Sequence, residues 1–199
     1  MTDERVRRAY TARAEEYRAL LGTVEAADDR DRALIASWAA ELEGAVIDAG
    51  CGPGHWTAFL REREIDASGV DLVPAFIAGA RSAFPEVAFR VGTLTDLGVD
   101  DASLGGILAW YSVIHLPPDE LPTALAEFAR ALRSGGSLLL GFVEGPSVEP
   151  FDHAVTTAWF HPLDSLRASV ERAGFDVVHL ARRSDPGPRV HGELIAVRR

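Results

Sequence analysis

The sequence contains a single cysteine, Cys51, among 199 residues. One thiol cannot form an internal disulfide bond and cannot supply a cluster of thiolate ligands for a metal ion. Apolar runs are short: none approaches the roughly 18 residues of a membrane-spanning helix, and the N-terminus has no apolar core of signal-peptide length. We therefore expect a cytoplasmic protein with no membrane partner.

Basic residues are also scarce, with 20 Lys and Arg against 30 Asp and Glu and a formal net charge of −10. That average charge repels a phosphate backbone. The Arg-rich start at Arg5, Arg7 and Arg8 is flanked by acidic residues such as Glu4. Nucleic acid is therefore not an expected partner.

The length predicts one domain with a full-sized core. From residue 45 onward, short apolar runs alternate with stripes of helical spacing, a pattern that implies right-handed crossovers and a parallel sheet. The expected strands are 45–49, 67–71, 87–91, 107–110 and 137–142, and the expected helices between them are 56–64, 74–82 and 118–133.

The two ends of the chain depart from this alternation. Val6, Tyr10, Ala14, Tyr17 and Leu21 form a helical stripe at the start, and a second helix is expected over 29–43. A helix at 163–172 is followed by apolar runs at 175–181 and 190–197, which a turn-rich segment joins into an antiparallel hairpin. The predicted fold class is therefore α/β: a Rossmann-like, mostly parallel seven-stranded sheet with helices on both faces and a C-terminal antiparallel hairpin.

The first strand ends in the turn Asp48-Ala49-Gly50-Cys51-Gly52-Pro53-Gly54. Glycines at these positions allow a sharp turn and let a ligand approach the backbone, while the helix that follows offers free N–H groups. Asp71 ends the next strand, 23 residues after Asp48. Its carboxylate can accept hydrogen bonds from both hydroxyls of a ribose.

The spacing G-x-G-x-G resembles the first motif of the class I S-adenosylmethionine-dependent methyltransferases, of the type that acts on small molecules. The resemblance covers roughly residues 40–199 and includes Gly69-Val70-Asp71, the passage from Leu132 to Leu140 and the terminal hairpin. It implies a single methyltransferase domain over 1–199. Its expected parts are an N-terminal helical cap (1–44), a cofactor-binding core (45–142), a substrate-side connection (143–162), and a helix with the terminal hairpin (163–199).

The same resemblance implies that S-adenosylmethionine is the cofactor and S-adenosylhomocysteine the product. Asp71 would then hold the ribose and Leu72 would touch the adenine. Relatives commonly have an acidic residue where Thr93 stands, and Asp96 follows three residues later, so either side chain could meet the adenine. The cofactor-binding residues implied are Tyr17, Asp48, Gly50, Cys51, Gly52, Gly54, Trp56, Asp71, Leu72, Gly92, Thr93, Leu94, Ala109 and Trp110.

The end of the fourth strand faces the site, because ligands of open α/β sheets bind at the carboxyl ends of the strands. Trp110 and Tyr111 could stack on an aromatic acceptor or steady the sulfonium, or they could pack the sheet edge. His115 resembles a histidine of the small-molecule members and could be a base or a structural residue. No Asn-Pro-Pro-Tyr type motif is present here, which argues against methylation of a nucleobase or amide nitrogen.

The connection 143–162 is long enough to be functional and is expected over the methyl group, although a plain packed loop is the alternative. Glu144, Asp152 or His153 could take a proton from a hydroxyl nucleophile. Asp152 and His153 with His161 could suggest a metal, but no matching ligand cluster appears elsewhere, and no metal is expected. The candidate catalytic residues are His115, Tyr111, Glu144 and His153.

These observations predict transfer of a methyl group to the oxygen or carbon of a small molecule by direct displacement, in a monomer or homodimer. An NAD-dependent oxidoreductase is a rival, but its turn would favour G-x-G-x-x-G and it would need more chain for a substrate domain. A non-catalytic module that binds S-adenosylmethionine is a second rival. A sensor needs no second cavity beside the methyl group, whereas an enzyme does.

Overall fold

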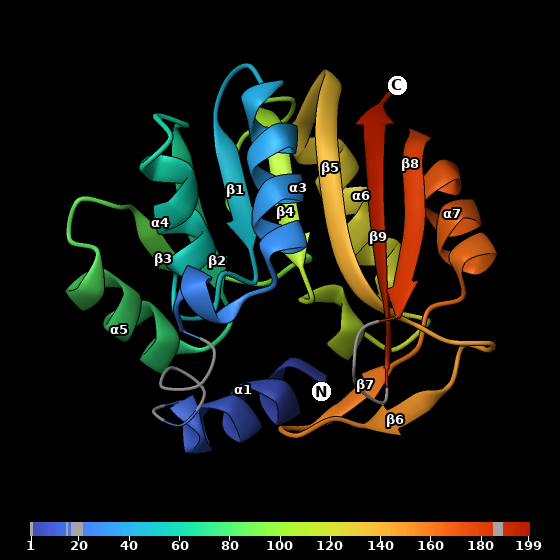
Figure 1. The fold of residues 1–199 in the computed structure, drawn as a ribbon, viewed down its shortest axis with the longest axis horizontal. Coiled ribbons are helices and arrows are strands. Elements are labelled where there is room, and N and C mark those ends of the chain that lie inside the picture. Colours follow the sequence, from blue (N-terminus) through green and yellow to red (C-terminus); the bar gives the residue numbers. More distant parts are fainter. Residues whose placement is uncertain (1, 15, 17–21, 185–188) are drawn as a thin grey trace.

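A seven-stranded sheet in the order β3-β2-β1-β4-β5-β9-β8 forms the centre of the computed structural model, which describes residues 2–14, 16, 22–184 and 189–199 (Figure 1). Pairing is parallel from β3 through β5, and β9 runs antiparallel to both β5 and β8. This confirms the predicted fold class, including the terminal hairpin. The strands are β1 (Val46–Ala49), β2 (Ala67–Asp71), β3 (Phe89–Val91), β4 (Leu104–Trp110), β5 (Leu132–Glu144), β8 (Phe175–Ser184) and β9 (Val190–Arg198).

Helices cover both faces of the sheet, because alternate strand residues point to opposite sides and both sides are apolar. On one face Val46, Leu108 and Leu139 pack with apolar side chains of α3 and α4. On the other, Ile107 and Leu140 pack with α6 and α7. The helices are α1 (Thr2–Ala12), α3 (Asp29–Ala40), α4 (His55–Arg61), α5 (Pro74–Ala83), α6 (Leu121–Ala131) and α7 (Leu163–Arg172), with short 3-10 turns η1 (Val24–Ala26) and η2 (Val113–His115).

Strand β4 begins three residues earlier than the sequence predicts, at Leu104 rather than Ile107. Its glycines do not break the strand but let another segment come close: a Cβ at Gly105 would lie 1.8 Å from the Glu43 carbonyl oxygen. The N–H of Gly105 donates to the Ala45 carbonyl at 2.8 Å. This close backbone contact anchors the start of β4 against the entry to β1.

The connection 143–162 is not a plain loop. It contains a small antiparallel sheet formed by β6 (Pro150–Asp152) and β7 (Thr157–Trp159), which single-sequence patterning did not predict. Figure 1 shows this pair and α1 below the sheet, at the end where the parallel strands finish. The Arg13 guanidinium donates to the Ala154 carbonyl and so links the residues after α1 to the β6–β7 turn.

Helix α1 packs its apolar stripe over this end of the sheet. Val6, Tyr10 and Ala14 contact the cluster formed by Val73 and Phe76. Tyr17 and Leu21, which the sequence places on the same stripe, lie outside the described residues. None of the described helices is both long and apolar enough to cross a bilayer.

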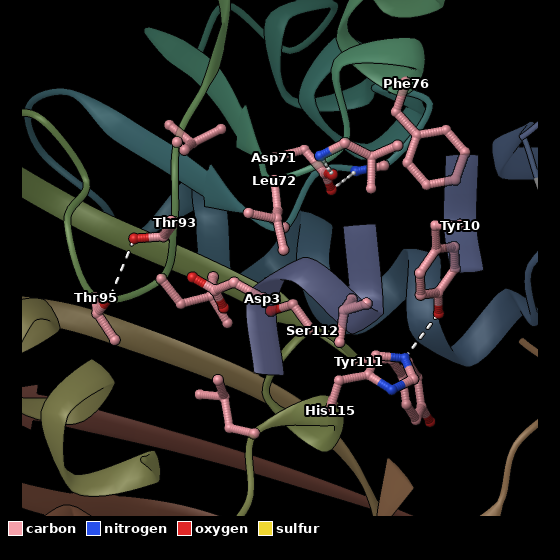
Figure 2. A pocket seen from close by; sticks show the side chains of 18 of the residues that line it. Asp3, Tyr10, Asp71, Leu72, Phe76, Thr93, Thr95, Tyr111, Ser112 and His115 are labelled. Atoms are coloured by element: carbon pink, nitrogen blue, oxygen red, sulfur yellow. Dashed lines mark hydrogen bonds between the residues drawn. The ribbon is translucent and has the colours of Figure 1, made fainter. Parts of the chain in front are cut away.

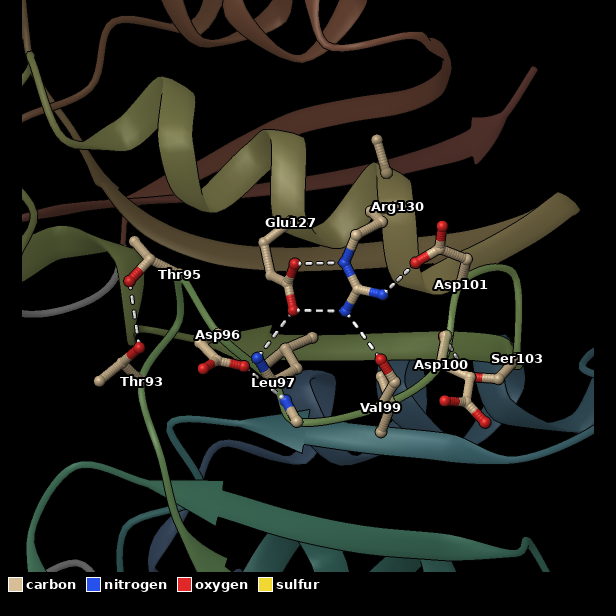
Figure 3. Close-up of polar contacts among 12 residues, drawn as sticks. Thr93, Thr95, Asp96, Leu97, Val99, Asp100, Asp101, Ser103, Glu127 and Arg130 are labelled. Atoms are coloured by element: carbon tan, nitrogen blue, oxygen red, sulfur yellow. Dashed lines mark hydrogen bonds and ion pairs between the residues drawn. The ribbon is translucent and has the colours of Figure 1, made fainter.

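The segment between β3 and β4 is held by α6 (Figure 3). The Glu127 carboxylate accepts from the Leu97 N–H at 2.8 Å and from the Arg130 guanidinium at 2.7 Å. Arg130 donates in turn to the Val99 carbonyl at 2.9 Å and pairs with Asp101. This network fixes the segment that starts with Thr93.

The close contact at Gly105 makes a first prediction. Gly105→Ala should lower the free energy of unfolding by about 2 kcal/mol or more, because the new methyl would overlap a backbone carbonyl that cannot move alone. Gly106→Ala is the matched control: its Cβ would meet side chains only, the end of Leu42 at 2.5 Å and those of Trp38 and Val46 at 3.3 Å, and these can shift more easily than a backbone carbonyl. Urea denaturation of both variants measures the difference, and equal losses would contradict the role given to Gly105.

Candidate functional site

The turn after β1 is bound to the ends of its neighbouring strands. The N–H groups of Gly50 and Cys51 both donate to the Val70 carbonyl, at 2.7 and 3.0 Å. Gly50 has a φ of 81°, and a Cβ there would lie 2.3 Å from the Cβ of Ser112, just after β4. Both the backbone angle and the space therefore require glycine, as the spacing of the motif predicts.

Asp71 at the end of β2 is oriented by two backbone donors. Its carboxylate accepts from the N–H of Gly52 and from that of Val73, each at 2.8 Å. Burial is the largest effect on this group and raises its pKa to about 6. Each carboxylate oxygen keeps a further lone pair, so the group can still accept hydrogen bonds from hydroxyls in the adjoining space.

That adjoining space is the first cavity, which encloses about 820 Å³ with its open mouth included (Figure 2). It lies between the ends of β1, β2, β3 and β4 and is covered by α1. Thr93 faces it, whereas Asp96 does not line it and instead accepts from the Gly98 N–H at 3.0 Å. Of the residues predicted to bind cofactor, the first cavity collects Gly50, Gly52, Asp71, Leu72, Gly92, Thr93, Leu94 and Trp110.

A second cavity, of about 1550 Å³ with its open mouth included, also adjoins the glycine turn. It is lined by Asp48, Cys51 and Trp56 among the predicted cofactor residues, and by His153 from the 143–162 connection. Its wall also includes Gly50, Gly52, Trp110 and Tyr111, which line the first cavity as well. The two cavities therefore meet at the ends of β1 and β4.

Asp48 is fully buried beneath this junction. Its carboxylate accepts from the Thr57 hydroxyl at 2.7 Å. Burial, with a smaller effect from the Asp71 charge, raises the pKa of Asp48 to about 7. Burial likewise raises the pKa of the Cys51 thiol, which keeps it protonated and unreactive, consistent with a small packing residue.

His115 joins the two segments that cover the strand ends. Its Nε2 lies 2.7 Å from the Tyr10 hydroxyl, as Figure 2 shows, and its Nδ1 lies 3.1 Å from the Thr157 carbonyl. A carbonyl only accepts, so Nδ1 carries the proton and Nε2 accepts from Tyr10. Burial lowers the pKa of His115, which keeps the imidazole neutral.

Tyr111 has a φ of 56°, which is unusual for a bulky side chain and common at functional sites. Its hydroxyl is hydrogen-bonded to Nδ1 of His191, and the two rings meet edge to face with centroids 5.6 Å apart. His191 also lines the second cavity, as do Arg183 and Arg189. Sequence reasoning missed these three residues, which lie in β8, in β9 and directly before β9, because the strand pattern shows that a hairpin forms but not which side chains reach the turn after β4.

Three further predicted residues, Glu144, Ala109 and Gly54, do not line the cavities. Glu144 lines neither of them and lies 3.7 Å from Arg182 in an ion pair. Ala109 is buried inside the sheet, and Gly54, with a φ of 88°, begins α4 behind the turn. Tyr17 is outside the described residues, and no group of three or more metal-ligating side chains occurs within the described part of the chain.

Comparison with known proteins agrees with this geometry. Residues 46–136 match a methyltransferase domain family. A malonyl-[acyl-carrier protein] O-methyltransferase of Erwinia billingiae is 30% identical over 139 residues, covering 69% of this chain and 52% of that protein. The chain spans only about a third to a half of the length of the curated relatives it matches.

Two solved structures show the same fold at a TM-score of 0.81. The [4+2]-cyclase SpnF is 18% identical and aligns over 100% of this chain and 97% of its own. The 1,6-didemethyltoxoflavin-N1-methyltransferase of Burkholderia thailandensis, with S-adenosylhomocysteine bound, is 22% identical over 98% and 88%. The family match makes residues 46–136, which contain the glycine turn and Asp71, a methyltransferase domain of the class I S-adenosylmethionine-dependent type.

The geometry of Asp71 predicts a loss of cofactor affinity on substitution. Asp71→Ala removes a charge-assisted acceptor for the ribose, worth roughly 1.5–3 kcal/mol. Affinity for S-adenosylhomocysteine, measured by isothermal titration, should fall by about ten- to a hundredfold. Asp96→Ala is the control, because Asp96 is exposed outside the cavity, and it should bind within about threefold of the unchanged protein. Equal affinities for both variants would mean that the ribose contact is misplaced.

Asp48 predicts a pH dependence of stability. Its folded-state pKa of about 7 lies above its ordinary value of 3.8, so the folded state binds the proton more tightly than the unfolded state does. This stabilisation is complete below about pH 4 and is lost as the pH rises through about 7, a change on the order of a few kcal/mol. Urea denaturation without cofactor at pH 5 and pH 8 measures it as a difference from a variant that cannot titrate, because His55, His153 and His161, whose pKa values burial lowers to about 4, act in the opposite direction over this range.

The control for that effect is Asp48→Asn, which keeps an acceptor for Thr57 but cannot titrate. Relative to this variant, the unchanged protein should lose stability between pH 5 and pH 8. The effects of Asp71 and of the buried histidines are common to both proteins and cancel in this difference. A pH dependence identical to that of the unchanged protein would show that Asp48 is ionised at neutral pH.

Proposed function

We propose that this protein transfers the methyl group of S-adenosylmethionine to a small molecule, at an oxygen or carbon atom and by direct in-line displacement. The observation that carries the proposal is the meeting of two cavities at Gly50, Gly52, Trp110 and Tyr111. One cavity presents the fixed Asp71 carboxylate, and the other opens beside it under the 143–162 connection. A binding module that only sensed the cofactor would need one cavity.

The residues fit this cofactor by their chemistry. Asp71 offers hydroxyl acceptors, Leu72 and Leu94 offer apolar contact to a purine, and the glycine turn has no side chain to block a close approach. When bound, S-adenosylmethionine supplies an electrophilic methyl group on a sulfonium sulfur. We assign residues 45–142 to the cofactor, 1–44 to a cap, and 143–162 to the acceptor side, within one domain over 1–199.

The protein's own part in the reaction is to align the acceptor and exclude water, since the methyl group is already electrophilic. Proton removal from an acceptor hydroxyl is the one further step required, and two groups stand at the second cavity for it. His153 is neutral at pH 7 because burial lowers its pKa to about 4. Tyr111, backed by His191, stands at the junction.

The fold alone does not settle the reaction, because a protein named as a cyclase shares it. A two-stage experiment tests the proposal. Isothermal titration should first show binding of S-adenosylhomocysteine and no binding of NAD. Small molecules that co-purify with the protein, identified by mass spectrometry, are then supplied together with labelled S-adenosylmethionine to detect methyl transfer. Comparable affinity for NAD would overturn the cofactor assignment, and failure of a broad acceptor screen would favour the binding module.

A matched pair of variants tests the acceptor side. His153→Ala should lower turnover of an identified acceptor by about tenfold or more while S-adenosylhomocysteine affinity stays within about threefold. Glu144→Ala should change neither, because Glu144 lines neither cavity. A larger loss of turnover in Glu144→Ala than in His153→Ala would mean that the acceptor binds elsewhere. The cytoplasmic location, the lack of a nucleic-acid partner and the monomeric or homodimeric state stay predictions.

A further inference from the structure

The charges around the second cavity are almost all neutralised by partners. Asp31 lies 2.5 Å from Arg183, which is also 3.7 Å from Glu193. Asp28 accepts from the Arg30 guanidinium at 2.9 Å. Asp48 is bonded to Thr57 and holds its proton up to about neutral pH. These pairs leave little net charge on that part of the wall.

Arg189 is the exception. It lines the second cavity at the start of β9, and no carboxylate among the described residues forms an ion pair with it. Its Nη2 donates to the Asp152 carbonyl at 3.0 Å, and its guanidinium lies 4.7 Å from the centroid of the Phe151 ring. The ring and the carbonyl fix the guanidinium plane, while most of its five donors stay available.

Arg189 is thus a positive charge without an ion-pair partner among the described residues, in a protein whose formal net charge is −10. His153 lines the same cavity, and burial lowers its pKa to about 4, with a smaller effect in the same direction from the Arg189 charge. A neutral His153 adds no negative charge to balance Arg189. An uncompensated guanidinium beside a cavity, held in a fixed plane, is the arrangement that recognises a planar anion.

We propose that Arg189 binds a carboxylate group of the methyl acceptor, so that the acceptors of this protein are small carboxylic acids. The inference rests on the proposed function, since it places the acceptor in the second cavity. A carboxylate fits better than a phosphate, because one guanidinium balances one negative charge and Arg183, the other arginine lining this cavity among the described residues, is paired with Asp31.

The methionyl carboxylate of the cofactor is the competing occupant for Arg189. The residues around Arg189 in the second cavity favour the acceptor as its ligand. Arg189 contacts Phe151 and Asp152 of β6, and it lines the second cavity together with His153. It does not line the first cavity, where the Asp71 carboxylate stands. Arg189 therefore lies at the part of the second-cavity wall that the 143–162 connection forms.

The test uses pairs of small molecules that differ only in charge: a set of aromatic and aliphatic carboxylic acids and the matching primary amides. Binding to the full chain saturated with S-adenosylhomocysteine is followed by ligand-observed NMR. The acids should give clearly more hits than the amides. In Arg189→Gln this preference should disappear, with the strongest acid binding at least tenfold more weakly. Arg182→Gln is the matched control and should retain the preference, because Arg182 is exposed, pairs with Glu144 and lines neither cavity.

A second measurement separates the two occupants. Arg189→Gln should leave the affinity for S-adenosylhomocysteine within about threefold and should not change the ratio of its affinity to that of 5′-methylthioadenosine, which lacks the amino-acid carboxylate. A loss confined to S-adenosylhomocysteine would assign Arg189 to the cofactor and overturn the inference. The inference would also be overturned if the acids and the amides gave equal numbers of hits, or if neither set gave any. If the unchanged protein fails to bind S-adenosylhomocysteine at all, the proposed function itself fails.

Discussion

The hydrogen bond from the Gly52 N–H to the Asp71 carboxylate, 2.8 Å long, is the contact on which the site depends. It joins the turn after β1 to the end of β2, and the neighbouring N–H groups of Gly50 and Cys51 reinforce it by donating to the Val70 carbonyl. Because Gly50 also packs against Ser112, the turn sets the spacing between the ends of β1, β2 and β4. The walls of both cavities follow from that spacing.

This arrangement is electrostatically costly without a ligand. Two carboxyl groups, Asp48 and Asp71, are buried beside each other, and burial raises the pKa of both. Hydrogen-bond donors from the chain offset part of the cost: the Thr57 hydroxyl for Asp48, and two backbone N–H groups for Asp71. Hydroxyl or ammonium donors of a ligand at this place would offset more of it.

The sequence predicted the parts of the fold that local pattern determines. Apolar alternation located the strands of the sheet, and the glycine spacing with Asp71 located the turn and its partner. Strand β4 was placed too late because two consecutive glycines carry no apolar signal of a strand, whereas Gly105 serves a backbone contact with Glu43, which is distant in sequence. Strands β6 and β7 have three residues each, too few for a periodic signal.

The second cavity was harder to predict for a related reason. Its wall combines the end of β4 with residues from the start of β9, and that meeting depends on the register of the antiparallel pair, in which Val143 faces His191. Register depends on the whole sheet and not on the residues near His191 or Arg189. The sequence could place His153 in a functional connection but could not show that Glu144, nine residues earlier, turns instead to Arg182.

The position of His115 bears on which residues can move protons in this site. One imidazole nitrogen accepts from Tyr10 of α1, and the other donates to the Thr157 carbonyl of β7. Both nitrogens are therefore engaged while the two covering segments are in place, and the ring connects segments that are more than 140 residues apart. A base must present a free lone pair to its substrate, which His115 lacks in this arrangement. This favours a positioning role for His115, holding the cover over the first cavity. Proton removal is left to the groups of the second cavity: the Tyr111–His191 pair, and His153, whose Nδ1 accepts only a long 3.4 Å contact from the Val155 N–H and is freed when that contact opens.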